Sequence, residues 1–491
     1  MLRSSITQST SKNTSRILNS LINKRYNNTI SSKGKILSVS TNNSGFTTVE
    51  FLPPSIPGTN GANKGSATNI KPLKVCLNNI FLRDASKSPN SVNPVTKQKL
   101  FNTGSLLKNI GFHCQPKRIQ VSECGGFVNI EWNDGDKFMY PYRFFVKYSG
   151  SSEISKLKDN KIFPHRQILW DSTKLQQQMT TDDGLTVDYE KFMNDDYVQY
   201  LTLLNMNKYG LAFIKNVPAV NSSSNSPDND SVLVSIVDKI GGFVVPTVYG
   251  NVFKFDATNT DTNTHTNIAF SEGKLPLHNS LTYLENTPGW HLLHSIKNVG
   301  DELEGVNYFV DGFNAAKYVR ELDTAAYQAL TNVPINFRFR QGDRRYYQSK
   351  PLIQEHESDN NNVLLSSYNE LIKEINYSPL NQAPFTFGIW NKGTNGDAVV
   401  TDKNKLTQRF EFEDFLRGLE TFEDFIDKPD NQFRIKTPSN TVVIFNNRRV
   451  LAGRSGFGKS NRVMNGCFMD NDPTISRLIY LEEKYGKKNL T

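Results

Sequence analysis

This chain of 491 residues has few of the features that hold small secreted proteins or membrane proteins together. It contains only four cysteines, which are widely spaced and form no C-x-x-C pair, so neither a disulfide framework nor a zinc ribbon is indicated. We expect free buried thiols, with a Cys114–Cys124 pair as the alternative. No run of 18 apolar residues occurs, so we expect no membrane span. The cysteines are Cys76, Cys114, Cys124 and Cys467.

Acidic residues are missing from the first 49 positions, which carry seven Lys or Arg among many Ser, Thr and Asn. A basic, serine-rich and acid-poor start is typical of a mitochondrial transit peptide, which we place at residues 1–35, and it predicts a location in the matrix. A plain basic tail is the alternative. The formal net charge is +9, of which this segment supplies +7, so the remaining +2 gives no reason to expect nucleic-acid binding.

The hydrophobic pattern predicts an α+β protein. Residues 127–132 alternate like a strand and run into a turn at 133–136, within a small β-rich domain at 46–150. A larger domain at 160–488 mixes helices and buried strands. We predict helices at 188–205, 312–330 (as a pair) and 364–375, and buried strands at 209–214 and 441–445.

Two motifs point to a family. Residues 275–281 read L-P-L-H-N-S-L, and residues 447–454 read N-R-R-V-L-A-G-R. They resemble two motifs of the γ-butyrobetaine and trimethyllysine dioxygenases, TauD-like enzymes that depend on Fe(II) and 2-oxoglutarate, with ascorbate. In that family the motifs read L-P-L-H-x-D-L and N-R-R-V-L-H-G-R. The resemblance extends from about residue 72 to the end. It implies a double-stranded β-helix, or jelly-roll, domain with outer helices, and a small β-rich domain before it.

The resemblance also implies where iron would bind. A facial triad of two His and one carboxylate holds Fe(II) in such enzymes. This chain keeps His278, but Ser280 and Ala452 stand where the family has its Asp and its second His. A neutral hydroxyl and a methyl group are poor replacements, so iron binding is not expected from this set.

A second metal site of the family is altered as well. The segment Phe81-Leu82-Arg83-Asp84 and the turn at 132–136 resemble the family's zinc-binding segments. The family's three Cys and one His are replaced here by Ser86, Ser88, Ser91 and Asp136. Serine does not replace a thiolate in a tetrahedral zinc site, so zinc is not expected.

Ligand-binding positions are better preserved. Arg462 has the spacing of the family's arginine that clamps the carboxylate of 2-oxoglutarate, ten residues after Ala452. A structural role, in which Arg462 pairs with Asp470 or Asp472, is the alternative. Asn267 and Phe270 match the cage for a quaternary ammonium group, with Phe in place of the family's Tyr.

Three other sequence features are explained without a catalytic or nucleotide-binding role. Residues 453–460 fit the P-loop pattern G-x-x-x-x-G-K-[ST], but a P-loop needs a helix after it, and Asn465-Gly466 would soon interrupt one. His291 and His294 should point to opposite faces of a strand, with His294 in the core. The basic patch of Arg338, Arg340, Arg344, Arg345, Tyr346 and Tyr347 is expected to face solvent or a partner.

The sequence therefore predicts a mitochondrial member of this dioxygenase family, oxidoreductase by resemblance, that has lost its iron triad and acts by binding. A small dicarboxylate, a betaine-like cation or a protein partner is the expected ligand, and the family suggests a homodimer. The alternative is an active Fe(II)/2-oxoglutarate dioxygenase with a non-standard iron site, hydroxylating a trimethylammonium amino acid. Nucleotide binding is a third, weaker interpretation.

Overall fold

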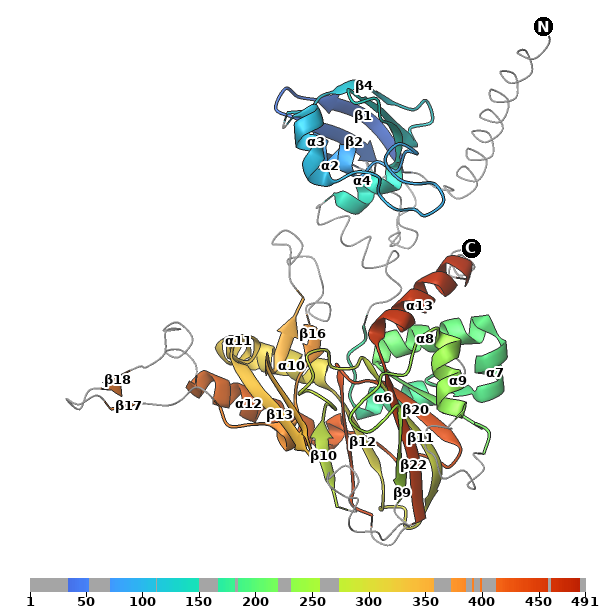
Figure 1. Cartoon of the computed structure of the whole chain (residues 1–491), viewed down its shortest axis with the longest axis vertical. Helices are drawn as coiled ribbons and strands as arrows, with labels where there is room; N and C mark the ends of the chain where they lie inside the picture. Colours follow the sequence, from blue (N-terminus) through green and yellow to red (C-terminus); the bar gives the residue numbers. More distant parts are fainter. Residues whose placement is uncertain are drawn as a thin grey trace, which may run out of the picture. The chain divides into compact units, whose positions relative to one another are not determined.

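The chain forms two compact units, residues Met1–Phe163 and Pro164–Thr491, which are described separately (Figure 1). The structure is a computed structural model. It describes residues 34–52, 71–111, 113–149, 167–181, 184–219, 231–256, 273–356, 372–385, 391–392, 398–399, 412–457 and 461–485. Most of the expected transit segment thus lies outside the described residues.

The small unit contains two antiparallel three-stranded sheets, β1-β2-β3 and β4-β5-β6. Its alternating strands bury one face in a common core that includes Val49, Phe51, Ile130 and Trp132. The predicted strand at 127–132 and its turn are confirmed, whereas β1 begins before residue 46, the expected start of this domain. The elements are β1 Lys35–Thr41, β2 Phe46–Leu52, β3 Leu73–Asn78, α2 Asn79–Asp84, α3 Thr103–Ile110, β4 Pro116–Val121, β5 Phe127–Trp132, β6 Lys137–Pro141 and α4 Tyr142–Tyr148.

Two sheets dominate the large unit. One has six strands in the order β7-β8-β20-β11-β22-β9, and the other has four in the order β10-β21-β12-β19. Apart from the parallel pair β7–β8, all neighbours in them are antiparallel. The strands are β7 Thr186–Asp188, β8 Leu211–Lys215, β9 Val252–Asp256, β10 Leu275–His278, β11 Trp290–Val299, β12 Asn307–Asp311, β19 Phe433–Ile435, β20 Thr441–Asn446, β21 Val450–Arg454 and β22 Asn461–Met469.

The two sheets face each other across an apolar interior. Phe309 of β12 lies 5.4 Å from Phe445 of β20, and Phe213 of β8 lies 6.3 Å from Phe433 of β19, ring centre to ring centre. Period-two alternation decides which side chains enter this interior. On β11, for example, Leu293 packs inward while Leu292 joins the cluster on the outer face.

Helices cover the outside. The cluster on the outer face of the six-stranded sheet includes residues of α8, α9 and α13, and a second cluster joins α10, α11 and α12 to β13, β15 and β16. Asp195 caps α8 through its side chain, and Gly210 ends it in the left-handed conformation with φ 74°. The remaining elements are α6 Ser172–Met179, α7 Tyr189–Asn194, α8 Asp196–Tyr209, α9 Ser231–Ile240, α10 Gly312–Leu322, α11 Thr324–Asn332, β13 Pro334–Gln341, β14 Arg344–Pro351, β15 Ile353–Glu355, β16 Ile372–Ile375, β17 Asn391–Lys392, β18 Ala398–Val399, α12 Phe412–Asp427 and α13 Asn471–Tyr485, with short 3-10 turns at Pro379–Asn381 and Pro429–Asn431.

The expected α+β class with a jelly-roll arrangement is confirmed, as are the helix pair after residue 312 and the buried strands β8 and β20. The predicted helix at 364–375 is wrong where the structure describes it, because β16 is a strand that pairs with β15. The expectation of buried thiols holds for Cys114 and Cys467 but is wrong for Cys76 and Cys124, which are exposed; all four are free. None of the described helices is long and apolar enough to cross a membrane.

Candidate functional site

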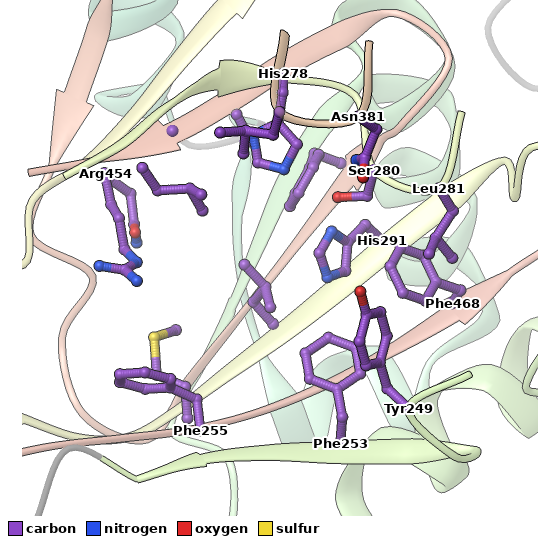
Figure 2. A pocket seen from close by; sticks show the side chains of 18 of the residues that line it. Tyr249, Phe253, Phe255, His278, Ser280, Leu281, His291, Asn381, Arg454 and Phe468 are labelled. Carbon is purple, nitrogen blue, oxygen red and sulfur yellow. The ribbon is translucent and has the colours of Figure 1, made fainter. Parts of the chain in front are cut away.

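A cavity of about 500 Å³ opens between the two sheets of the large unit. Its size lies within the usual range for small-molecule sites, about 300–1,000 Å³. Residues from β9, β10, β11, β12, β20, β21 and β22 line it, and the β13 strand contributes to one side. In the view of Figure 2, Arg454 and Phe255 lie on one side and Leu281 and Phe468 on the other, with His278, Ser280 and His291 around the space.

The predicted iron positions meet at this cavity. His278 ends β10 and lies directly opposite Ala452 of β21 in the antiparallel pairing, and both line the cavity together with Ser280. The Nδ1 atom of His278 is 2.9 Å from the carbonyl oxygen of Pro276, which can accept a hydrogen bond from Nδ1–H. Burial lowers the pKa of His278, so its imidazole is neutral at pH 7.

The backbone around Ser280 is held by the second motif. The Ser280 N–H donates to Oδ1 of Asn447 at 2.8 Å, and Nδ2 of Asn447 donates to the carbonyl oxygen of Ser280 at 2.9 Å. The next residue, Leu281, is buried with a φ of 62°, an unusual conformation for a bulky residue. Such strained backbone persists only where its surroundings fix it, and it concentrates at binding and catalytic sites.

His291 is a second imidazole in the cavity. Its ring stacks on Phe468 with centres 4.2 Å apart and also approaches Phe445 and Phe253. Burial, and then the nearby His278, lowers the pKa of His291 to about 3, so it is neutral at pH 7. Neither ring nitrogen has a hydrogen-bond partner among the described residues. A buried polar group without a partner is costly, so His291 is suited to bind a ligand atom.

The opposite part of the cavity holds two guanidinium groups. Arg462 is 2% exposed; its Nη2 donates to Oδ1 of Asn307 at 3.1 Å and contacts the sulfur of Met464 at 2.9 Å, whereas Nε and Nη1 have no partner in the described part of the chain. Arg454 donates from Nη1 to the carbonyl oxygen of Gly273 at 2.8 Å. Burial lowers the pKa of Arg462 to about 9, and the charge of Arg454 adds to the effect, but both groups stay protonated at pH 7.

Aromatic rings surround these two cations. Phe457 and Phe255 pack edge to face, 5.2 Å apart, and the guanidinium carbon of Arg462 lies 5.2 Å from the ring centre of Phe457. Arg454 lies 4.7 Å from the same ring. Cation–π attraction therefore offsets part of the cost of burying the two charges together. The alternative role for Arg462, pairing with Asp470 or Asp472, finds no such ion pair among the described contacts.

The residues that line the cavity do not fit Fe(II), but they do fit a carboxylate such as that of 2-oxoglutarate. Among the described residues no group of three or more His, Cys, Asp or Glu is placed to hold a metal ion. His278 and His291 offer two imidazoles without a carboxylate, which does not match a two-His, one-carboxylate triad for Fe(II). The buried, partly unpaired guanidinium of Arg462 does fit a carboxylate, to which Nε or Nη1 can donate a charge-assisted hydrogen bond.

The other predicted residues have mixed outcomes. Asn267 and Phe270 lie outside the described residues, so the cage stays a prediction. Arg338 and Arg340 are exposed as expected, but they also line the cavity, which the sequence alone did not indicate. The P-loop interpretation is not supported, because the strand β22 follows the glycine-rich segment where a helix would be needed. His291 and His294 do point to opposite faces of β11, and His294 is fully buried.

Residues 171–468 match the family model "Taurine catabolism dioxygenase TauD, TfdA family". The "Probable oxidoreductase AIM17" of Saccharomyces cerevisiae is 41% identical over 425 residues, which cover 84% of this chain and 87% of that protein. The "Gamma-butyrobetaine dioxygenase" of Pseudomonas sp. is 25% identical, over 83% and 90% of the two chains. "Trimethyllysine dioxygenase, mitochondrial" of Gallus gallus is 24% identical, over 82% and 83%.

Proposed function

Because the chain belongs to the TauD, TfdA dioxygenase family, we propose that it is a mitochondrial member that binds a small carboxylate ligand in its jelly-roll cavity without iron. The family and its oxidoreductase relatives set the class of protein. The observation that carries the binding role is Arg462, a buried cation in the cavity with two unpaired donor nitrogens.

Support for the loss of iron comes from Ala452, which lies opposite His278, and from Ser280, two residues after it. Ala452 has no donor atom, and the hydroxyl of Ser280 is neutral near pH 7 and a weak ligand for a divalent ion. Removing even a group that only orients a metal ligand costs about 10–100-fold in metal affinity or activity. Two replaced ligands therefore argue for a site that no longer retains Fe(II).

Support for carboxylate binding comes from the cost of burying Arg462. A buried charge is tolerated when a counter-charge or hydrogen bonds offset its loss of water. Asn307 satisfies one nitrogen, and aromatic faces supply some attraction, but Nε and Nη1 are left for a ligand. The N–H groups of Nε and Nη1 point in different directions, so a ligand carboxylate can accept a charge-assisted hydrogen bond from either of them, and a second polar ligand atom can accept from the other.

The mitochondrial location rests on the basic, acid-free first 49 residues and on the trimethyllysine dioxygenases, which are named as mitochondrial. A homodimer is a further expectation from the resemblance. Import of a fusion of residues 1–35 to a fluorescent protein tests the first point, and sedimentation of the mature chain tests the second.

One observation favours a second candidate, an oxygenase with a non-standard iron site. His291 places an unpaired imidazole in the same cavity as His278, and the relatives are named as dioxygenases or as a probable oxidoreductase. In this case Fe(II) would be held by His278 with unconventional ligands, and a trimethylammonium amino acid would be the substrate.

An anaerobic titration separates the two candidates. Fe(II) is added to the mature protein with 2-oxoglutarate present, and the charge-transfer absorption of chelated iron is followed. The same protein is then titrated with 2-oxoglutarate in the presence of EDTA by calorimetry. We expect no absorption band up to millimolar iron, together with metal-independent binding of 2-oxoglutarate.

Variants of Arg462 identify the anchor. Arg462→Met should weaken 2-oxoglutarate binding by about 1.5–3 kcal/mol, the usual value of hydrogen bonds to charged groups, and Arg462→Lys should restore part of it. Arg417→Met, at an exposed arginine on α12, is the matched control. A saturating iron band would establish the oxygenase candidate instead, and equal affinity of wild type and Arg462→Met would remove the binding proposal.

A further inference from the structure

All the charged side chains that line the cavity in the described part of the chain are arginines. Four arginines line it, and none of the described lining residues is Asp or Glu. Two of the four, Arg454 and Arg462, are buried between the sheets, whereas the other two, Arg338 and Arg340, are exposed on β13. A cleft lined by charge of one sign concentrates ions of the opposite sign.

The β13–β14 hairpin explains how Arg338 and Arg340 come to lie together. Residues two apart on a strand share a face, so both side chains stand on the face opposite Phe337 and Phe339, which are buried. Arg340 pairs in register with Arg345 of β14, which adds another cation beside it. No ion pair formed by the described residues includes Arg338 or Arg340, so neither charge is neutralised by a described carboxylate.

Aromatic rings line the same cavity as the four arginines. Tyr283 stacks on Phe339 with centres 4.8 Å apart, and Tyr249 lies 6.1 Å from Phe339 and from Phe253. Phe339 belongs to β13, and in Figure 2 Tyr249 and Phe253 lie apart from Arg454. An apolar segment of a ligand would pack against them.

We propose that the ligand is an elongated organic dianion, an α,ω-dicarboxylate, held at its two ends by different arginines. This inference rests on the proposed function and names the ligand class. Arg462 receives the inner carboxylate, and Arg338 with Arg340 receives the outer carboxylate at the open side of the cavity. The carbon chain lies along the aromatic rings. A betaine-like cation does not suit this site, because its ammonium group would meet cations without a described carboxylate to balance them.

The experiment compares ligands that differ in one property at a time. Full-length mature protein in EDTA is titrated by calorimetry with suberate, octanoate, glutarate and γ-butyrobetaine. Suberate and octanoate have the same number of carbons but two and one carboxylates; suberate and glutarate have two carboxylates but different lengths. We expect suberate to bind at least about tenfold more tightly than octanoate and glutarate, as one additional charged contact would give.

The double variant Arg338→Gln/Arg340→Gln locates the outer carboxylate. It should weaken suberate binding about tenfold and leave glutarate binding within twofold, because only the longer ligand reaches both ends. Arg344→Gln, on the same hairpin but outside the cavity lining, is the control and should bind suberate like the wild type. Both arginines are exposed, so the substitutions should not disturb folding, which a melting curve checks.

The possible results distinguish the inference of a dianionic ligand from the proposal that Arg462 binds a carboxylate. Binding of glutarate and suberate with equal affinity, unchanged in the double variant, would overturn the dianion inference while leaving the anchor at Arg462 in place. Failure of every carboxylate to bind would overturn both. Tighter binding of γ-butyrobetaine than of suberate would show that the site selects a cation and would also overturn the inference.

Discussion

Ala452 lies directly opposite His278 where β10 pairs with β21, and both residues line the same cavity. Side chains opposite each other in an antiparallel pair have Cβ atoms about 4.5–5.5 Å apart, close enough to share a metal ion. Ser280 follows two residues after His278, with its backbone fixed by Asn447. The scaffold thus still presents three positions around one space, although two of the three side chains have no strong metal-binding atom.

This arrangement predicts that iron binding can be restored by two substitutions. The double variant Ser280→Asp/Ala452→His should gain the charge-transfer absorption of Fe(II) with 2-oxoglutarate under anaerobic conditions. Each single variant should lack it, because one His and one carboxylate, or two His, leave the triad incomplete. Ser280→Asn/Ala452→Gln is the matched control of similar size. A band of equal strength in the wild type would contradict the prediction.

The buried imidazole of His291 predicts a pH dependence of stability. Burial, and then His278, lowers its pKa from about 6.5 in the unfolded chain to about 3 in the folded protein. Its other close neighbours on β9, β20 and β22 are the uncharged rings of Phe253, Phe445 and Phe468. Between these values the unfolded state binds the extra proton. The contribution of neutral His291 to the free energy of unfolding is therefore constant above about pH 6.5, and it is lost as the pH falls from about 6.5 towards about 3.

The variant His291→Gln isolates this contribution. Gln keeps a polar side chain and does not titrate. From pH 7 to pH 5 the wild type should lose up to about 2 kcal/mol more stability than the variant, since one pH unit corresponds to about 1.4 kcal/mol. Urea unfolding at each pH measures it. His113→Gln, at an exposed histidine, should follow the wild type, and an identical profile for His291→Gln would refute the assignment.

Much of the large domain could be predicted from the sequence because its motifs are structural. The second Arg of the N-R-R motif, Arg449, forms a buried ion pair at 2.7 Å with Asp311, the last residue of β12. Asn447 joins the same motif to Ser280. A Cβ on Gly312 would come within 2.7 Å of the carbonyl oxygen of Arg449, so only glycine fits there. Because these residues are needed for folding, the motifs can be recognised in the sequence even though the iron-ligand positions within them, Ser280 and Ala452, have changed.

The parts that sequence reasoning missed depend on contacts far apart in the chain. His291 appeared as one of two histidines on a strand, and only the packing of Phe445 and Phe468 shows that its ring is buried in the cavity without a partner. Arg338 and Arg340 read as surface cations, and only the folded hairpin shows that they line the cavity. The helix expected up to residue 375 fails because β15 supplies a pairing partner that local periodicity does not reveal.

The Arg449–Asp311 pair predicts a large effect on stability. Arg449 also donates to the carbonyl oxygens of Lys208 and Ile168, both at 2.7 Å, so its side chain joins three segments of the large unit. Arg449→Met would leave the buried carboxylate of Asp311 without its counter-charge, although the N–H groups of Trp170 and Phe313 still donate to it, and should lower the free energy of unfolding by about 3–5 kcal/mol. Urea unfolding followed by tryptophan fluorescence measures this. Arg434→Met, at an exposed arginine over Tyr308, is the control, and a loss no larger than the control's would contradict the role.

The altered zinc positions of the small unit form a polar cluster in the structure. The hydroxyls of Ser88 and Ser91 both donate to Oδ1 of Asp136, and Arg83 donates to Ser91 Oγ and to Asp134, each at 2.8 Å. All but Asp134 are buried. Hydrogen bonds and a cation thus lie where the family has thiolates and a metal ion, which predicts that the unit holds its fold without zinc.

Hydrogen exchange of the full chain tests this prediction locally. EDTA should leave the exchange of residues 79–92 and 127–141 unchanged, because no metal contributes there. Asp136→Ala should speed it strongly, since removing one partner of a buried charged network costs about 3–5 kcal/mol. Asp136→Asn keeps an acceptor for the two hydroxyls and should have a smaller effect, and Glu131→Gln, in a surface ion pair, should have none. Faster exchange in EDTA that added zinc reverses would show that Ser88, Ser91 and Asp136 still hold a metal ion and that the hydrogen-bonded cluster does not stand in for one.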